Sequence, residues 1–241
     1  MALGDRNYMA QTQSRAGAAQ VDEGLRKYML GVYNYMALGV AFTGIVALFV
    51  ASQPALMEAI ALSNFRWVLF IGIIGLGFFA PRVMMSGSMA MAHGAFWLYA
   101  AMWGALMSPM FVLYTGDSMV RVFFITAATF AGVSLYGYTT KRNLAPMGAF
   151  LAMATIGILV ALLVNIFLLQ SGMFHLALSV VVVLVFSALT AYETQMIKNM
   201  YYAGDVAEAV ARKSIFGAFA LYGSFVTLFI WLLQIFGVAR E

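Results

Sequence analysis

Glu193 is the residue with the clearest potential for chemistry, because it is an acidic residue at the end of a long apolar run. The run begins near Phe174 and ends with Ala191-Tyr192-Glu193-Thr194-Gln195. Of the nine acidic residues in the chain, Glu193 is the only one that the pattern places within the hydrocarbon layer of a membrane. A carboxylate there is costly unless it has a partner, a proton or water, so such a residue marks a candidate functional site.

The composition of the chain predicts the membrane around this residue. The 241 residues are 64% hydrophobic and 9% charged, and their mean hydropathy is +0.92. Ordinary soluble domains are about 25% charged. The absence of cysteine excludes disulfides, thiolate metal ligands, cysteine nucleophiles and palmitoylation. We therefore expect an all-α integral membrane protein whose spans of about 20 residues leave room for short loops only.

Seven apolar stretches are long enough to cross a bilayer as helices, which predicts a seven-helix transmembrane domain at residues 25–241. The preceding tail, residues 1–24, is polar and lacks the apolar core of a cleaved signal peptide. Because proline disfavours helix at the residue before it, we expect the second span to end at Pro81-Arg82. Residues 198–213 are predicted to form the most polar internal loop. The expected spans are 28–51, 67–80, 90–111, 119–138, 147–169, 174–194 and 215–236.

The basic residues predict the orientation of these spans. With seven spans, ten Lys and Arg residues fall on one side of the membrane and three on the other. Cytoplasmic loops carry an excess of Lys and Arg, so the sequence predicts a cytoplasmic N-terminus and an external C-terminus. This topology accounts for the basic composition, and we expect no nucleic-acid partner. The ten are Arg6, Arg15, Arg26, Lys27, Arg82, Lys141, Arg142, Lys198, Arg212 and Lys213, and the three are Arg66, Arg121 and Arg240.

The same topology places Arg82 at the depth of Glu193. The second and sixth spans both run inward, and the two residues lie near the cytoplasmic ends of these spans. A guanidinium beside a carboxylate favours its ionised form, whereas removal from water favours the protonated form. We therefore expect Arg82 and Glu193 to be able to form a proton-sensitive latch.

Several short motifs, none of them specific alone, together point to a family. The most informative is Tyr192-Glu193-Thr194-Gln195, and the motifs are spread over residues 25–237. The others are Leu25-Arg26-Lys27-Tyr28-Met29, Val32-Tyr33-Asn34-Tyr35-Met36, Tyr114-Thr115-Gly116, Gly137-Tyr138-Thr139-Thr140-Lys141-Arg142 and Leu221-Tyr222-Gly223-Ser224-Phe225-Val226-Thr227-Leu228-Phe229. On these motifs the chain resembles the Bax inhibitor-1 family, also called the transmembrane Bax inhibitor motif family, and within it the bacterial YccA-like branch.

The resemblance implies a fold in which the last of seven helices is central and surrounded by the other six. It also implies one of two functions in the bacterial inner membrane. Better-studied relatives are described as pH-sensitive calcium leak pathways, in which two aspartates on the sixth and seventh helices share a hydrogen bond. In these relatives an arginine on the second helix latches to one of the aspartates. YccA-like relatives are instead described as binding and restraining the membrane-embedded FtsH protease.

At the positions of this site, the sequence departs from the family pattern. Glu193 stands where the first aspartate is expected, Ser224 where the second is expected, and Arg82 near the latch arginine. Two nearby carboxylates can share a proton, whereas a Glu and a Ser cannot. Ser224 can still donate a hydrogen bond to an ionised Glu193, so we expect the contact to survive and the two-carboxylate pH switch to be altered. Calcium prefers several oxygen ligands, so the loss of a carboxylate also weakens a calcium pathway.

The remaining polar and soft-donor residues have simpler interpretations. Four methionines and His93 lie between residues 84 and 93 and could hold Cu(I), but methionine is also common filler at helix ends, and we expect no metal site. Because there is no zinc motif, Gly-rich phosphate loop or nucleophile with a base, we expect neither an enzyme nor a cofactor. Two classes of function stay open in addition to contact with the lipid bilayer. One is a calcium leak gated by Glu193, and the other is an interaction protein that modulates an FtsH-type protease through residues 1–24.

Overall fold

Long helices make up almost all of the chain. The computed structural model describes residues 2–61 and 63–240, with side chains at 22–60 and 63–240. In this part of the chain, seven helices are long and apolar enough to span a membrane, and the only strand-like pairing is an isolated bridge between Tyr114 and Ala239. A bilayer core offers no water to exposed N–H and C=O groups, so helices, which pair these groups internally, are the expected structure.

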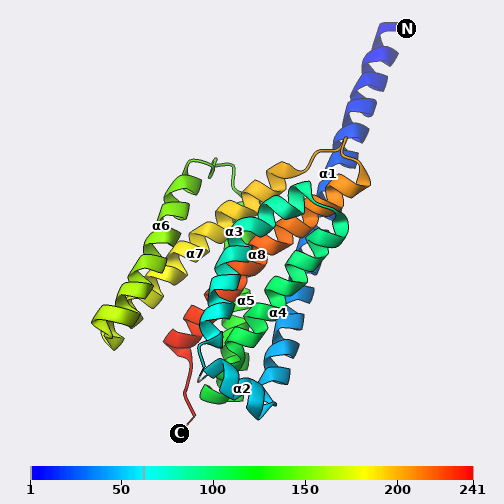
Figure 1. Ribbon diagram of the computed structural model, residues 1–241. Helices are drawn as coiled ribbons and strands as arrows, with labels where there is room; N and C mark the ends of the chain where they lie inside the picture. Colours follow the sequence, from blue (N-terminus) through cyan, green and yellow to red (C-terminus); the bar gives the residue numbers. More distant parts are fainter. Residues whose placement is uncertain (1, 62, 241) are drawn as a thin grey trace.

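The helices follow one another with short connections, as Figure 1 shows. Each of the seven expected spans is found, and one short helix that the sequence did not predict, α2, lies between the first two. The bounds are α1 Ala2–Ala51, α2 Pro54–Ala61, α3 Phe65–Ser86, α4 Met89–Leu113, α5 Gly116–Thr139, α6 Met147–Val164, the π-helical turn η1 Asn165–Leu169, α7 Gly172–Met200 and α8 Ala207–Phe236.

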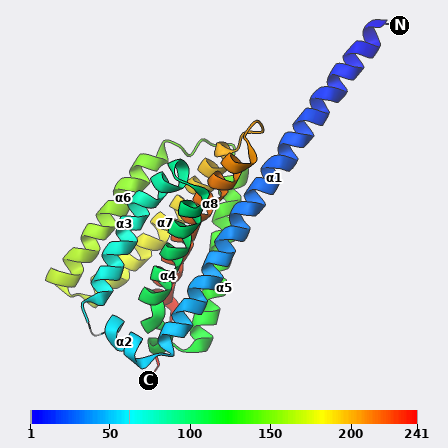
Figure 2. The ribbon, with the colours of Figure 1, turned by 45° about the vertical axis from the view of Figure 1, so that its right-hand side comes forward.

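α1 runs without a break from the expected tail into the first span. Its N-terminal part projects beyond the other helices in both views (Figures 1 and 2). The part that is apolar enough to span a membrane is Asp22–Ala51. Of the tail predicted at residues 1–24, residue 1 and the side chains up to residue 21 lie outside the described residues. The backbone of the tail from Ala2 onward is helical.

Three helix ends differ from the expected boundaries: the end of α3, the end of α7 and the start of α8. α3 continues past Pro81 to Ser86 instead of stopping at the proline. A proline within a helix removes one backbone hydrogen bond, and membrane helices tolerate this loss because their surroundings compensate for it. The loop expected at 198–213 is also shorter. α7 ends at Met200 and α8 begins at Ala207, so the polar residues on either side of the connection belong to helices.

α8 is the most buried of the seven long helices. In its most apolar stretch 67% of the residues are buried, compared with 33% or less in the other six. α1, α3, α4, α5 and α7 lie against it, whereas α6 packs mainly against α7 at the edge of the bundle (Figure 1). Side chains of α8 therefore form much of the core.

A buried hydroxyl pair joins α8 to two other helices. The Tyr222 hydroxyl lies 2.6 Å from Thr43 Oγ1 on α1, and Thr43 Oγ1 lies 3.1 Å from the carbonyl oxygen of Ala100 on α4. Tyr222 is fully buried and Thr43 is 4% exposed. Buried polar groups need hydrogen-bond partners, and here these groups satisfy one another across three helices.

The motif Tyr114-Thr115-Gly116 forms the turn between α4 and α5 and pairs with the C-terminal segment. Thr115 Oγ1 accepts a hydrogen bond from the N–H of Ser118 (3.3 Å), which caps α5. The Thr115 N–H donates to the carbonyl oxygen of Val238 (3.1 Å), and the Val238 N–H donates to Ser118 Oγ (2.8 Å). This motif therefore fixes the end of the chain against the α4–α5 turn.

Candidate functional site

The predicted hydrogen bond between Ser224 and Glu193 is present. Ser224 Oγ on α8 donates to Glu193 Oε2 on α7, and the two oxygens are 2.7 Å apart. Ser224 is 2% exposed and Glu193 is partly buried. The apolar run stops near Glu193, but α7 continues to Met200. Glu193 therefore lies about two turns before the end of the helix. The carboxylate is therefore part of the contact between α7 and α8.

Arg82 does not contact this pair, so the expected latch is not formed in this structure. Arg82 is exposed, whereas Ala80 and Met84 on the same helix are buried. Arg82 is two residues from each of them, and two residues turn a helix by about 200°. α3 thus directs Ala80 and Met84 inward and Arg82 away from the bundle. The ion pairs among the described residues are Lys27 with Glu23, Arg212 with Glu208 and Lys213 with Asp205.

Thr194, the neighbour of Glu193, faces α5 and belongs to a chain of hydroxyl groups. Thr194 Oγ1 donates to the carbonyl oxygen of Thr190 (2.8 Å) and lies 2.9 Å from Ser134 Oγ. Ser134 Oγ in turn lies 2.6 Å from the Tyr33 hydroxyl on α1. Each hydroxyl has one proton, so Ser134 donates to Thr194 and Tyr33 donates to Ser134. The chain joins α1, α5 and α7 beside the carboxylate.

Gln195 holds the connection between α5 and α6. Its Oε1 accepts a hydrogen bond from the N–H of Leu144 (2.7 Å), and its Nε2 donates to the carbonyl oxygen of Arg142 (2.8 Å). An amide side chain can pair with a backbone donor and a backbone acceptor at once, which suits a connection without helical hydrogen bonds. Gln195 belongs to the motif Tyr192-Glu193-Thr194-Gln195, but the motif itself does not predict this role.

A close approach of two backbones positions the α7 segment that carries Glu193. A Cβ at Gly137 of α5 would lie 2.9 Å from Ala191 Cα and closer still to the carbonyl oxygen of Ala191. α5 and α7 can touch here only because residue 137 has no side chain, as is common where membrane helices cross. Gly137 and Gln195 thus explain two of the family motifs structurally.

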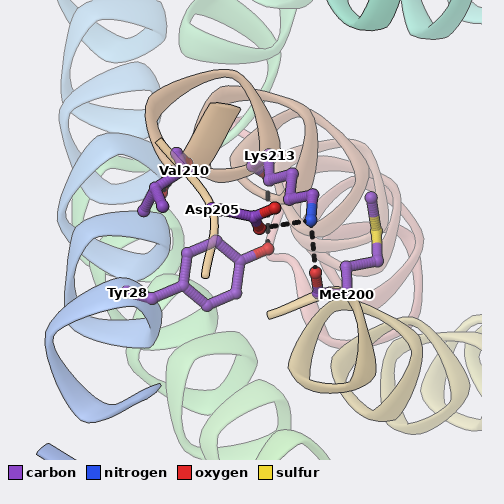
Figure 3. A network of polar contacts seen from close by, with 6 residues as sticks. Tyr28, Met200, Asp205, Val210 and Lys213 are labelled. Carbon is purple, nitrogen blue, oxygen red and sulfur yellow. Dashed lines mark hydrogen bonds and ion pairs between the residues drawn. The ribbon is translucent and has the colours of Figure 1, made fainter. Parts of the chain in front are cut away.

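A second polar network, which was not predicted from the sequence, ties the α7–α8 connection to α1 (Figure 3). Lys213 Nζ lies 2.5 Å from Asp205 Oδ2 and donates to the carbonyl oxygen of Met200 at 2.8 Å. The Tyr28 hydroxyl donates to the carbonyl oxygen of Lys213 (3.4 Å). The side chains of Lys213 and Asp205 are 20% and 18% exposed. Their opposite charges, both within the loop predicted at residues 198–213, were the available signal in the sequence.

His93, the histidine of the candidate soft-donor group, is engaged with α1. Its Nδ1 lies 2.5 Å from the Tyr35 hydroxyl. Met84 is fully buried, whereas Met85 and Met91 are exposed, so these thioethers are spread over different faces of α3 and α4. The structure thus gives His93 and Met84 packing and hydrogen-bonding roles.

Comparison with known proteins supports the reading of the motifs. Residues 25–241 match the family model described as inhibitor of apoptosis-promoting Bax1. The chain is 40% identical over 220 residues to inner membrane protein YbhL of Escherichia coli, covering 90% of this chain and 94% of the relative. It is 39% identical over 220 residues to an uncharacterized protein of Rickettsia prowazekii (91% and 93% covered) and 33% identical over 224 residues to an uncharacterized membrane protein of Streptococcus pyogenes (90% and 95% covered). The chain therefore belongs to the Bax inhibitor-1 family, as a multi-pass protein of the bacterial inner membrane.

Proposed function

We propose that this protein is a proton-modulated calcium leak pathway whose gate is the pair of Glu193 and Ser224. The observation that carries the proposal is a carboxylate on an apolar helix that accepts a hydrogen bond from the most buried helix of the bundle. Ionisable groups inside membrane spans are rare and typically mark ion or proton pathways. Calcium binds oxygen ligands, and the carboxyl group of Glu193 supplies such oxygens to the path.

Opening of this gate requires α7 and α8 to separate at Ser224. A cavity of about 720 Å³ between α1 and α5 is lined by Ser134 and Phe225 but not by Glu193. The conformation described above is therefore the closed one under this proposal. When Glu193 is ionised its hydrogen bond to Ser224 is charge-assisted, and protonation replaces it with a weaker neutral bond. We expect acid to loosen the contact and raise the flux.

The proposed membrane arrangement has the N-terminus in the cytoplasm, the C-terminus outside and α8 at the centre. The burial of α8 supports its central place. The α5–α6 and α7–α8 connections lie at the end of the bundle from which α1 projects, and the C-terminus lies at the other end (Figure 1). These two connections carry or adjoin Lys141, Arg142, Lys198 and Lys213, so the positively charged end is the one that the proposal places in the cytoplasm.

Calcium flux into liposomes tests the role of Glu193. For the reconstituted wild type we expect flux about fivefold faster at acidic than at basic pH, since a charge-assisted hydrogen bond exceeds a neutral one by roughly 1 kcal/mol. Glu193→Gln should remove this pH dependence, because the amide stays neutral. Glu208→Gln is the matched control: it makes the same chemical change at an exposed position paired with Arg212, and should behave as wild type. A pH profile in Glu193→Gln that equals the wild-type profile would refute the gate.

The projection of α1 favours a second function, the modulation of an FtsH-type protease. A helix that extends beyond the bundle presents a surface to a partner outside the bilayer. Deletion of residues 2–21 is expected to abolish co-purification with such a protease and to leave calcium flux unchanged. Glu193→Gln should have the opposite pattern, with the complex intact and the flux altered. A protease complex that survives the deletion would count against this second function.

A further inference from the structure

A groove between α1 and α5 opens on the outer surface of the bundle. It is the 720 Å³ cavity described above, within the size range of small-molecule sites. Its walls come from residues 26–37 of α1 and 127–138 of α5, and Phe225 of α8 lies at the bottom. Phe225 is 6% exposed, whereas Leu30 and Leu135 at the rim are 49% and 62% exposed. The open side of the groove therefore faces away from the core.

The groove has the length of one membrane leaflet. One end is at Arg26, near the start of the membrane-spanning part of α1, and at Tyr138, next to the last residue of α5. The other end is at Ala37 of α1 and Ala127 of α5. On each helix the two ends are eleven residues apart, which at about 1.5 Å per residue is about 16 Å. The hydrocarbon core of a bilayer is about 30 Å thick. The groove thus runs from one membrane surface to the middle of the bilayer.

The end of the groove at the membrane surface is positively charged. Arg26 lines it, and Lys198 Nζ lies 4.8 Å from the ring centroid of Tyr138 and donates to the carbonyl oxygen of Tyr138. No Asp or Glu is among the residues that line the groove. On α1, Glu23 precedes Arg26 and forms an ion pair with Lys27. Its Oε1 lies 2.9 Å from Lys27 Nζ. This end is therefore suited to an anionic group.

The remainder of the groove is suited to an alkyl chain. Its lining is mostly Met, Ala, Leu and Phe, and the hydroxyl groups of Tyr33 and Ser134 are paired with each other at 2.6 Å. Asn34 also lines the groove, and its side chain makes no hydrogen bond to the other described residues. Because an unpaired amide in an apolar setting is costly, a polar part of the occupant or accompanying water belongs beside Asn34.

We propose that this groove binds one anionic phospholipid from the leaflet at the Arg26 end. The phosphate lies at Arg26, and one acyl chain follows α1 and α5 toward Phe225. Both walls are membrane-spanning helices, so lipid is the solvent at the open side, and the charge at Arg26 selects an anionic headgroup. The proposal does not depend on the calcium leak, because Glu193 does not line the groove.

Native mass spectrometry of the full-length protein in detergent tests this site, with phosphatidylglycerol and phosphatidylcholine as probes. The wild type should retain one phosphatidylglycerol molecule about fivefold more tightly than phosphatidylcholine, the preference expected from one basic side chain. Arg26→Gln should remove this preference. Arg121→Gln, at the opposite end of α5 and outside the groove, should leave the preference unchanged. Equal retention of the two lipids by the wild type would overturn the proposal.

A second pair of variants tests the place of the acyl chain. Ala131 lines the groove and Ala128 on the same helix does not, and both are exposed. Ala131→Phe should fill the groove and abolish retention of both lipids, whereas Ala128→Phe should retain them as the wild type does. Retained phosphatidylglycerol in Ala131→Phe would overturn the proposal. So would displacement of the lipid by inorganic phosphate, because the headgroup alone would then account for binding.

Discussion

Gly137→Ala is expected to lower the melting temperature of the purified protein by about 6–12 °C, the effect of roughly 3 kcal/mol in a chain of this length. The added methyl group would lie 2.9 Å from Ala191 Cα and overlap the carbonyl oxygen of Ala191. Both neighbours are backbone atoms of a long helix, so they cannot yield as a side chain can. α7 would have to move away from α5, which would also strain the contacts of Thr194 and Gln195.

Gly132→Ala is the matched control for this prediction. Gly132 is on the same helix, and a Cβ there would meet no atom within 4 Å. Alanine is preferred over glycine inside helices by about 1 kcal/mol, so this variant should melt at the wild-type temperature or slightly above it. The measurement is thermal unfolding in detergent, in which the fraction of protein that stays monodisperse is recorded against temperature. Equal melting temperatures for the two variants would show that the α5–α7 contact has room to relax.

Ser224→Asp is expected to make the stability of the protein strongly dependent on pH. The substitution places a second carboxyl group next to Glu193, where the present oxygens are 2.7 Å apart. Two charges this close in an apolar bundle repel each other, so the folded protein should hold one shared proton between them. The unfolded chain releases this proton as the pH rises, so stability is greatest in acid and falls by about 1.4 kcal/mol per pH unit. The melting temperature should then fall by about 3–5 °C per pH unit.

Two variants control for the other effects of this substitution. Ser224→Asn has nearly the same size as the aspartate without its charge, and its stability should not acquire the pH dependence. The double variant Glu193→Gln with Ser224→Asp has only one carboxyl group of the pair, so its stability should depend less steeply on pH than that of Ser224→Asp. Calcium flux through Ser224→Asp should also gain pH dependence relative to the wild type. A flat pH profile of stability in Ser224→Asp would show that the two side chains separate in the variant.

The number and approximate positions of the spans were predictable from the sequence, because the thickness of the bilayer requires apolar segments of a set length. The failures are at helix ends. Pro81 did not end α3, since a membrane helix can continue after losing one hydrogen bond. The apolar run that stops near Thr194 did not end α7, which continues to Met200. Hydrophobicity reports the depth at which lipid ends, and the helix itself can extend into the polar region.

The candidate site was predictable only in part. The contact of Glu193 with Ser224 followed from the resemblance to the Bax inhibitor-1 family, and the hydrogen bond confirms it. The expected contact of Glu193 with Arg82 is wrong for this structure, because depth in the membrane and the resemblance to the family both leave open which way the Arg82 side chain points. Depth follows from topology, but the direction in which a side chain leaves its helix depends on how that helix is rotated by its neighbours.

The sequence by itself determined the membrane class, the seven spans, the family and the identity of the one carboxyl group in the apolar interior. Each of these depends on the types of residue and their order along the chain, because the bilayer requires apolar helices of a set length and basic residues in the cytoplasmic loops. The tertiary structure decided which side chains meet Glu193, how Gln195 and Lys213 hold the connections, and where α1 and α5 leave a groove. These features join residues far apart in the sequence, and they depend on the rotation and close approach of helices such as α5 and α7 at Gly137.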